Sequence, residues 1–350
     1  MSDFFTHCHE QAGWCRELGS PFTAALCEAF AQSAERGGIV AELAATIAPP
    51  HRKRASALRL AGALHYAVLS GRSPDLSNLY PKGSTDWQMS EIWPVAEAYL
   101  EADRDHVEAF ITSDPQTNET RRSIALLPGF LEIAERFGSP VHLVELGASA
   151  GLNQTLDQFC YSGPNWRIDG GGDVEISTEW HASALSGVFP KVQSRAACDL
   201  NPIDLRQEEA QWRLKSYTWA DQSERLARLD AAMMLALEAG TRVEKADAAE
   251  WLERKLATRP KSGTAVVFHS VFLHYPPTAV RAKITDLIAA AGDQATFDRP
   301  LAWLCMEPDS VFENDNPRLG MFRVQLQTWP SGEVQTLGYT DGHVTYFEAG

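Results

Sequence analysis

The hydrophobic pattern of the chain changes near residue 140. Before that point apolar residues recur at helical spacing, as in Leu58, Ala61 and Leu64, and no alternation of period two is sustained. After it, short apolar runs typical of buried strands alternate with helical segments. Strands and helices that alternate in this way pair in parallel, with helices on both faces of the sheet. The sequence therefore predicts a helical N-terminal region over residues 1–138 and an α/β domain over residues 139–350.

Candidate elements follow from these patterns. The predicted strands of the sheet cover residues 141–146, 194–200, 241–246, 264–269 and 301–306. The predicted helices before them cover residues 55–71, 90–112 and 119–137, the last interrupted near Pro128-Gly129 and closed by Gly138. Three more strands are predicted at residues 322–329, 334–340 and 343–348. The Asp341-Gly342 turn between the last two is a strong hairpin signal, so we expect an antiparallel C-terminal end to the sheet.

Charge and hydropathy exclude several classes of partner. The formal net charge of −15 argues against nucleic acid, because nucleic-acid binding rests on a concentrated basic surface. No apolar run approaches the roughly 20 residues that cross a bilayer, and MSDFFTHCHE lacks the pattern of a secretory signal. We therefore expect a cytoplasmic protein with no nucleic-acid or membrane partner, and the sequence leaves its oligomeric state open.

The six cysteines form no C-x-x-C pair and no regular framework, so we expect reduced thiols. A group near the N-terminus, His7, Cys8, His9 and Cys15, offers metal-ligating side chains. Its spacing matches no common closed site, and no metal is predicted.

The segment VHLVELGASAGLN, residues 141–153, contains two overlapping motifs. GASAG at 147–151 matches G-x-S-x-G, the nucleophile elbow of serine hydrolases, with Ser149 as the nucleophile. Glu145, Gly147 and Gly151 instead fit a glycine-rich turn from strand to helix that binds a nucleotide-like cofactor. The spacing lacks G-x-G-x-x-G and G-K-[ST], which disfavours a dinucleotide and excludes a P-loop.

The upstream sequence argues against the nucleophile elbow. An elbow follows earlier strands of its sheet and needs an upstream oxyanion loop, whereas the preceding 140 residues are predicted to be helical. Asp247 with His269, His274 or His343 could complete a catalytic triad in the right chain order. A serine hydrolase therefore stays as the third hypothesis.

Three acidic residues lie at the ends of the first three predicted strands of the α/β domain: Glu145 near the end of the first, Asp199 at the end of the second and Asp247 just after the third. Ligands of open α/β sheets bind at the carboxyl ends of the strands, beside the switch in strand order. Asp199 could accept both hydroxyls of a ribose, and Asp247 the exocyclic amine of an adenine. Glu145 could orient the loop or meet an ammonium group. Alternatively, Asp247 is the N-cap of the helix that begins at Ala248.

These features together resemble a class I methyltransferase that depends on S-adenosylmethionine (SAM). More narrowly, a bacterial family known only as domain of unknown function 2332 is similar to most of the chain, helical region included. The similar segments are PQTNETRRSIALLPG, VELGASAGLN, DLNPID, YTWADQSERL, ADAAEWL, VVFHSVFLHY and LAWLCMEP. The resemblance implies a Rossmann-like α/β fold with a mostly parallel sheet and an antiparallel C-terminal hairpin, preceded by a helical region. It brings no established reaction.

The resemblance also implies a set of cofactor contacts. They are the methionine-side loop (Glu145, Gly147, Ala148, Ser149, Gly151 and Asn153), the ribose contacts (Asp199 and Asn201), the adenine contacts (Asp247 and Ala248) and the end of the fourth strand (His269 and Ser270). Ser149 replaces the usual middle glycine of the loop. The long separation of Glu145 and Asp199 implies an insertion near residues 161–191, which we expect to be a surface excursion.

Methyl transfer from a sulfonium needs an aligned nucleophile, little water and sometimes a base. The candidate catalytic residues His269, His274 and Tyr275 follow the fourth strand. The alternatives are that His269 is a hydrogen-bonded core histidine and that Tyr275 only packs.

Polar residues on either side of the predicted sheet could contact the substrate. Asn118 and Glu119, before the first strand, and Glu307, after the fifth, are candidate lid or substrate contacts. Asn118 could instead be a helix N-cap.

The first functional hypothesis is a SAM-dependent methyltransferase acting on a small molecule, with the helical region as a lid over the substrate. The second is a module on the same fold that binds an adenosyl ligand or a protein partner without catalysis, since a fold does not fix a function.

Overall fold

A computed structural model describes residues 2–81, 86–138, 140–312 and 317–350 of the chain. The chain divides into two compact units, and each consists of two segments. Unit 1 is Met1–Thr117 with Leu205–Asp230, and unit 2 is Asn118–Asp204 with Ala231–Gly350. This division differs from the expected boundary at residue 138.

Packing explains the different boundary. The helix that precedes the first strand packs on the sheet of unit 2, and the segment from residue 205 returns to the helices of unit 1. Neither fact is visible in a local hydrophobic pattern, because the pattern does not identify the partner of an apolar face.

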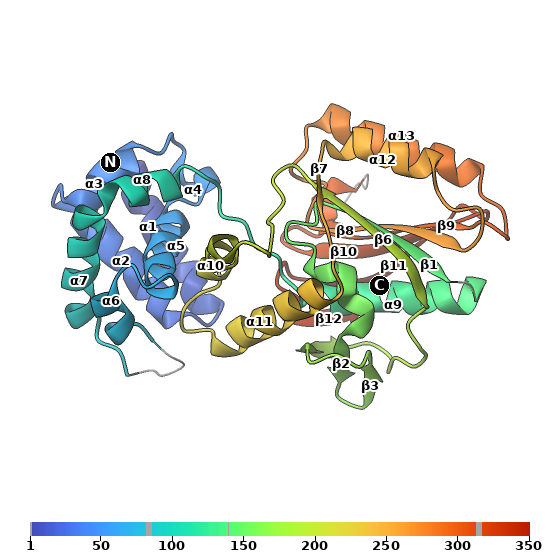
Figure 1. Ribbon diagram of the computed structural model, residues 1–350, viewed down its shortest axis with the longest axis horizontal. Coiled ribbons are helices and arrows are strands. Elements are labelled where there is room, and N and C mark those ends of the chain that lie inside the picture. Colours follow the sequence, from blue (N-terminus) through green and yellow to red (C-terminus); the bar gives the residue numbers. More distant parts are fainter. Residues whose placement is uncertain (1, 82–85, 139, 313–316) are drawn as a thin grey trace. The chain divides into compact units, whose positions relative to one another are not determined.

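Unit 1 is helical (Figure 1). Its helices are α1 (Ser2–Glu17), α2 (Pro21–Glu35), α3 (Ile39–Ala45), α4 (His51–Arg54), α5 (Ser56–Leu69), α6 (Pro74–Leu79), α7 (Met89–Ala102), α8 (Arg104–Ile111) and α10 (Glu208–Ser216). Helix α11 (Ser223–Glu238) contains the boundary at Asp230.

Helix α5 is the centre of unit 1, and its observed bounds confirm the helix predicted at residues 55–71. Leu60 and Leu64 are fully buried in the core of the unit. The segment from residue 205 packs closely on this helix, since a Cβ added to Gly62 would lie 2.8 Å from the ring of Tyr217. The glycine therefore permits the close approach of the two segments.

The single helix expected at residues 90–112 is wrong, because the chain forms α7 and α8 there. The break is at Asp103, whose backbone is not helical (φ −115°, ψ 38°). The Asp103 carboxylate accepts hydrogen bonds from Arg72 Nη1 (2.8 Å) and the Tyr99 hydroxyl (3.2 Å). These two bonds fix the Asp103 side chain at the break.

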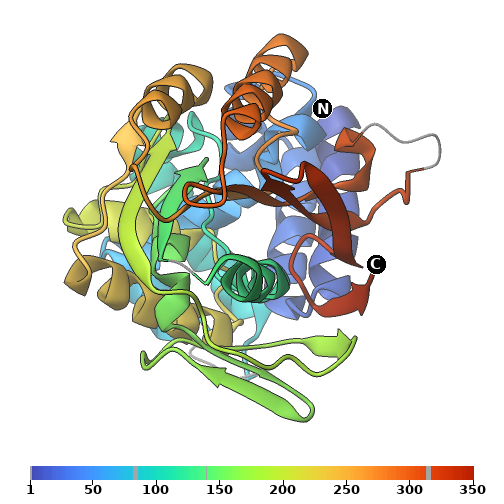
Figure 2. The same cartoon turned by 90° about the vertical axis from the view of Figure 1, so that its right-hand side faces the viewer.

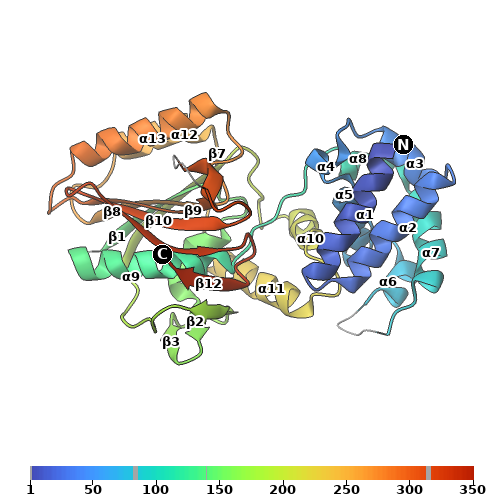
Figure 3. The same cartoon turned by 180° about the vertical axis from the view of Figure 1, so that it is seen from behind.

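Unit 2 is a sheet with helices on both faces. Its main sheet contains β1 (Val141–Leu146), β5 (Glu179–His181), β6 (Val192–Asp199), β7 (Glu244–Lys245), β8 (Thr264–Ser270), β9 (Leu301–Pro308), β10 (Phe322–Trp329), β11 (Glu333–Thr340) and β12 (Tyr346–Ala349). Figures 2 and 3 show α12 (Ala248–Ala257) and α13 (Thr278–Asp293) on one face and α9 (Arg122–Phe137) on the other.

The strand order is β5-β12-β11-β10-β9-β8-β1-β6-β7. The strands from β7 to β9 in this order pair in parallel, and β9, β10, β11 and β12 pair antiparallel. The mostly parallel sheet and its antiparallel C-terminal end are thus confirmed. The chain runs outward from β1 to β6 and β7 and then crosses to β8 on the other side of β1, so the strand order switches between β1 and β8.

The insertion re-enters the main sheet. Strands β2 (Cys160–Gly163), β3 (Trp166–Asp169) and β4 (Glu175–Ser177) form a small sheet of their own, in the order β3-β2-β4. The next strand, β5, pairs with β12, and Trp180 stacks on Phe347 with ring centroids 4.4 Å apart. The expected surface excursion therefore also supplies an edge strand of the main sheet.

Helix α9 is continuous through Pro128, so the interruption expected there is wrong. A proline removes one backbone N–H, but the packing of the helix on the sheet outweighs this loss. A Cβ added to the adjacent Gly129 would lie 2.4 Å from the Leu304 side chain and 3.1 Å from that of Leu337. At Gly129, therefore, α9 closely approaches β9 and β11. The helix ends at Gly138, as predicted.

None of the helices in the described part of the chain combines the length and the apolar character of a membrane span.

The close approach at Gly129 yields a test of this packing. We expect Gly129→Val to destabilise unit 2 by about 1–3 kcal/mol, the usual cost of overpacking, because the new side chain would overlap Leu304. The measurement is the thermal unfolding midpoint. Glu135→Val, which places the same side chain at an exposed position of the same helix, is the control and should shift the midpoint far less. Equal shifts for the two variants would contradict the packing at Gly129.

Candidate functional site

Several candidate residues gather at the carboxyl ends of the parallel strands. Strands β1, β6 and β8 are neighbours, with Glu145 paired to Ala197 on one side and to Phe268 on the other. The carboxyl ends of parallel strands lie at the same edge of a sheet, and the strand order switches at this edge. The structure therefore brings the loop after β1 next to Asp199.

The loop after β1 has an unusual backbone. Gly147, Ser149 and Gly151 all have left-handed φ values, of 67°, 54° and 75°. A serine adopts this region at a cost, so the surrounding structure must hold it there. The Ser149 N–H donates to Asp199 Oδ2 at 2.9 Å, and the Ser149 carbonyl accepts from the Ile203 N–H at 3.1 Å.

Asp199 thus orders two loops. Its Oδ1 accepts a hydrogen bond from the Asn201 N–H at 2.8 Å, while its Oδ2 holds Ser149. A carboxylate has about four lone-pair sites, so both oxygens keep capacity for a ligand. Asn201 itself is exposed and Asp199 is half-buried.

The two glycines of the loop are required by close neighbours. A Cβ on Gly147 would lie 2.4 Å from the Phe272 ring, and one on Gly151 would lie 2.9 Å from Val243 Cγ2. The loop is therefore held between the segments that follow β8 and precede β7. Ala148, between the glycines, is buried, and its N–H donates to the Cys198 carbonyl at 3.0 Å.

Glu145 is a buried carboxyl group at the base of this loop, with 4% of its surface exposed. Its Oε2 accepts a hydrogen bond from Gln154 Nε2 at 2.8 Å. Burial raises the pKa of Glu145 to about 8; the hydrogen bond from Gln154 opposes this shift, and the charge of Asp199 adds to it. Glu145 is therefore mostly protonated at neutral pH in the absence of a ligand.

The segment that follows Glu145 contains three buried polar atoms without a hydrogen bond to any residue that the structure describes. They are Ser149 Oγ, Asn153 Oδ1 and Gln154 Oε1. Leaving a buried polar atom unpaired costs about 1–3 kcal/mol, and native proteins keep few of them. Two of the three are pure acceptors, so a ligand group with N–H donors would satisfy them.

Asn118 and Glu119 also lie at this loop or near it. Asn118 Oδ1 accepts a hydrogen bond from the Leu152 N–H at 3.0 Å, which ties residue 118 to the start of the 3₁₀-helix η1 (Leu152–Gln158). Glu119 is buried and accepts from the Arg121 N–H at 3.1 Å. The N-cap of α9 is Arg121, so the alternative of Asn118 as the N-cap is wrong.

Asp247 has the capping role that the sequence left open. Its Oδ1 accepts hydrogen bonds from the N–H groups of Ala249 (3.0 Å) and Glu250 (3.1 Å) at the start of α12. The next residue, Ala248, is buried in the core under this helix. An adenine contact is not needed to explain either residue.

His269 is engaged inside the sheet. It is fully buried; its Nδ1 lies 2.6 Å from Glu307 Oε1, and its Nε2 accepts a hydrogen bond from Trp303 Nε1 at 2.9 Å. Because Trp303 can only donate, Nε2 is unprotonated and Nδ1 donates to Glu307. Both ring nitrogens are therefore occupied, as in the core-histidine alternative. Ser270, the next residue, is half-buried at the end of β8.

Glu307 is a second buried carboxylate, with an electrostatic state opposite to that of Glu145. Burial alone would raise its pKa, but the hydrogen bond from His269, the approach of His274 and the Phe272 N–H (2.8 Å) together lower the pKa to about 2. Its Oε1 receives the bonds from His269 and Phe272. Its Oε2 has no hydrogen-bond partner within the described residues and lies 3.9 Å from His274 Nδ1.

His274 and Tyr275 form the exposed part of the loop after β8. Their rings are in contact, tilted by 40° with centroids 3.8 Å apart, and Tyr275 is 74% exposed. Val271 at the start of this loop has a left-handed φ of 55°, which is strained for a β-branched residue. Strain of this kind is common at functional sites.

Contacts link the two ends of the site. Phe272 packs on Gly147 and donates to Glu307, and Glu307 faces His274. The sequence did not single out Phe272, Gln154 or Trp303. Gln154 directly follows the predicted loop, so it could have been found; the roles of Phe272 and Trp303 depend on tertiary contacts.

The triad of a serine hydrolase is not assembled among the described residues. Ser149 Oγ is buried without a hydrogen-bond partner, although a nucleophile needs a base within hydrogen-bond reach. Two of the proposed partners, Asp247 and His269, are engaged elsewhere. In the same part of the chain, no group of three or more His, Cys, Asp and Glu side chains is placed to hold a metal ion.

Comparisons with known proteins identify a family but no reaction. A family model described as "Uncharacterized protein conserved in bacteria (DUF2332)" matches residues 6–348. No curated protein and no solved structure matches the chain.

The raised pKa of Glu145 predicts a pH-dependent stability. The folded protein binds this proton more tightly than the unfolded chain, whose pKa is about 4.5, so the contribution is fully favourable below pH 4.5 and is lost as pH rises through about 8. Each pKa unit corresponds to about 1.4 kcal/mol, so the loss amounts to several kcal/mol. We expect Glu145→Gln to gain stability relative to the wild type between pH 5 and pH 8, measured by thermal unfolding. Glu135→Gln, at an exposed position, should show no such gain. Parallel pH profiles of wild type and Glu145→Gln would contradict the burial of an ionisable group here.

Proposed function

The chain belongs to the DUF2332 family of uncharacterized bacterial proteins, and we propose that its unit 2 binds SAM and transfers the methyl group to a small molecule. The observation that carries the proposal is the set of unpaired buried polar atoms in the segment after Glu145, which follows the strand at the switch in strand order. Open α/β sheets bind their ligands at this position.

The methionine end of SAM suits the loop after β1. Its ammonium group carries N–H donors. Asn153 Oδ1 and Gln154 Oε1 are acceptors without a donor in the described residues, so they could receive these hydrogen bonds. A positive charge next to Glu145 favours the ionised carboxylate and so removes the proton that burial retains. Ser149 Oγ is buried in the same loop and can donate to the ligand carboxylate.

The nucleoside end would be held by Asp199 and the start of α12. Asp199 is fixed by two backbone N–H groups and keeps acceptor capacity for the ribose hydroxyls. Asp247 supports the adenine contact more weakly, because its Oδ1 already caps α12. In this proposal Asn201 and Ala248 are backbone neighbours of the two acids. Ser270 and Asn118 flank the loop.

SAM supplies an electrophilic methyl group on a sulfonium centre. Of the residues after β8, His274 is the proposed base, because its ring reaches the surface while His269 is fully buried. The ionised Glu307 lies 3.9 Å from His274 Nδ1 and would stabilise the protonated ring after it accepts a proton from a hydroxyl, amine or carboxyl acceptor. Glu307 is then a positioning residue, and Tyr275 packs against the base.

The second candidate is a module that binds SAM or another adenosyl ligand, or a protein partner, without catalysis. It is favoured by the engagement of His269, the candidate base that would lie nearest the sheet. Both candidates use the loop after β1 to bind the ligand. A binding measurement therefore tests the ligand site, and a turnover measurement tests whether the protein is a catalyst. We also propose a cytoplasmic location, since six free thiols suit a reducing compartment.

Calorimetry with SAM, S-adenosylhomocysteine and adenosine tests the cofactor. We expect the wild type to bind SAM and Asp199→Asn to bind it about 10- to 100-fold more weakly, since a hydrogen bond to a charged group contributes about 1.5–3 kcal/mol. Asp173→Asn, an exposed position in the insertion, is the matched control and should keep full affinity. Absence of binding to the wild type would remove SAM from the proposal, and full affinity in Asp199→Asn would remove the ribose role.

Turnover tests catalysis separately. We expect S-adenosylhomocysteine to form when the protein and SAM meet one of a panel of small hydroxyl, amine and carboxylate acceptors. His274→Gln should lower this rate about 10²- to 10⁴-fold, the usual contribution of a general base, with unchanged affinity for SAM. Tyr275→Phe keeps the ring that contacts His274 and should leave the rate nearly unchanged. Tight SAM binding without turnover on any acceptor would favour the non-catalytic candidate.

A further inference from the structure

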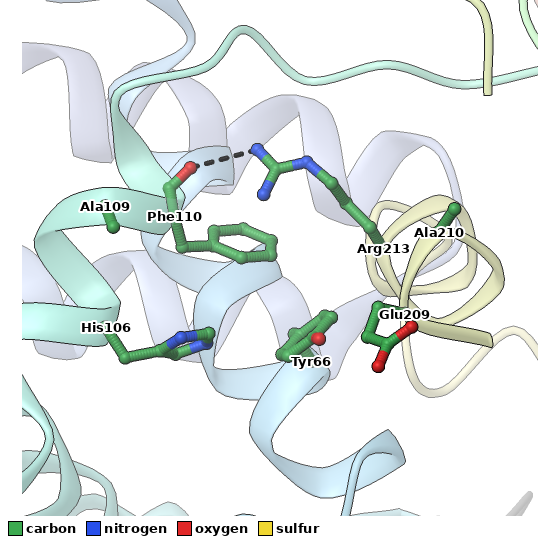
Figure 4. Close-up of a pocket in the computed structure, with 7 residues that line it drawn as sticks. All are labelled: Tyr66, His106, Ala109, Phe110, Glu209, Ala210 and Arg213. Atoms are coloured by element: carbon green, nitrogen blue, oxygen red, sulfur yellow. Dashed lines mark hydrogen bonds between the residues drawn. The ribbon is translucent and has the colours of Figure 1, made fainter. Parts of the chain in front are cut away.

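Unit 1 contains a pocket of its own, of about 290 Å³ (Figure 4). It is lined by Tyr66, His106, Phe110, Glu209 and Arg213, with two alanines at its margin. These residues come from α5, α8 and α10. A pocket of this size is at the lower limit of those that hold drug-like molecules, so it suits a ligand with one small ring system.

The walls of the pocket are aromatic. The Tyr66 ring centroid lies 5.3 Å from those of His106 and Phe110, and the centroids of His106 and Phe110 are 6.3 Å apart. These separations fall within the range of interacting aromatic pairs. Three rings that meet at one pocket favour a planar ligand that can stack on them or meet their edges.

A fixed cation lies on one side of these rings. The Arg213 guanidinium carbon lies 4.2 Å from the Phe110 ring centroid, and Figure 4 shows the guanidinium above this ring, with Tyr66 and His106 below it. Its Nη2 donates to the Phe110 carbonyl (3.0 Å) and to the Tyr217 hydroxyl (3.3 Å). Both bonds start from the same nitrogen, and a guanidinium has five N–H groups. Arg213 is thus held in place while it keeps donors for an anion.

His106 adds a polar atom to the same pocket. Its Nε2 is buried and has no hydrogen-bond partner in the described residues. Burial lowers the pKa of His106, and the positive charges of Arg72 and Arg213 add to this shift, while the negative charge of Asp103 opposes it. The ring is therefore neutral at pH 7. A neutral imidazole offers one donor and one acceptor, and here one of these groups lacks a partner.

We propose that this pocket binds a small aromatic carboxylate, with its ring against the aromatic wall of Tyr66, His106 and Phe110 and its carboxylate on Arg213. The opposite charge, Glu209, is exposed in the first turn of α10, so water screens it. Arg213 is half-buried and fixed, and its planar fork matches a carboxylate. An anionic ligand is therefore favoured over a cationic one. The site is independent of the SAM proposal, since all its residues belong to unit 1.

The test uses ¹⁹F NMR line broadening with the full-length protein and three probes of one size. These are 4-fluorophenylacetate, the neutral 4-fluorobenzyl alcohol and the cationic 4-fluorobenzylamine. We expect the carboxylate to bind with a dissociation constant of about 1 mM or below, and the other two at least about tenfold more weakly. No broadening with 4-fluorophenylacetate, or equal binding of all three probes, would overturn the proposal.

Two variants locate the binding. Ala109→Phe adds a ring at an exposed position in the pocket margin, so it obstructs the pocket without removing a buried contact, and we expect at least about tenfold weaker binding of 4-fluorophenylacetate. Ala102→Phe, at an exposed position of α7 outside the pocket, is the matched control and should bind as the wild type does. Arg213→Gln should abolish the preference for the carboxylate over the alcohol. Unchanged binding in Ala109→Phe, or an unchanged preference in a folded Arg213→Gln, would refute the site.

Discussion

The carboxylate of Asp199 joins the ends of two neighbouring parallel strands. One oxygen holds the N–H of Ser149 after β1, and the other holds the N–H of Asn201 after β6. A serine in the left-handed region is strained, and this bond is part of what holds it there. The loop conformation in turn places Gly147 under Phe272, and Phe272 reaches Glu307. One carboxylate thus links the loops after two strands, and contacts through Gly147 and Phe272 connect them to Glu307.

Two buried carboxyl groups at this edge have opposite protonation states, and their partners explain the difference. Glu145 receives one hydrogen bond from a neutral amide, so burial dominates and its pKa rises to about 8. Glu307 receives the His269 ring and a backbone N–H and faces His274, so its pKa falls to about 2. Although both carboxyl groups are buried, Glu145 is therefore protonated at neutral pH and Glu307 is ionised. In enzymes, pairs of titratable groups whose environments separate their pKa values in this way often mark acid and base roles.

Local pattern was sufficient for much of this architecture. The apolar runs predicted β1, β6, β8 and β9, because buried parallel strands are short and apolar. The glycine spacing predicted the loop, and the position of Asp199 at the end of a strand predicted that this acid lies at the same edge, since parallel strands end at one edge. The hydrogen bond from Ser149 to Asp199 was not predicted. The third strand, by contrast, is only Glu244–Lys245, because an edge strand needs little apolar surface.

What the sequence did not predict depends on contacts between distant segments. The partner of His269 is fixed by the pairing of β8 with β9, which no motif encodes. The continuity of α9 through Pro128 depends on the sheet beneath it. The pairing of β5 with β12 joins two segments far apart in the chain. In each case the structure depends on which segment packs against which. A hydrophobic pattern identifies the apolar face of a helix or strand, but it does not identify the segment that covers this face.

The division of unit 1 into two segments has a consequence for folding during synthesis. Domains usually fold in order as the chain leaves the ribosome. Here Met1–Thr117 emerges first, but α10, which packs on α5, is translated only after β1 and β6. The surface around Gly62 that later receives Tyr217 is uncovered during this interval. We therefore expect the N-terminal helices to lack one of their packing partners until α10 has been translated.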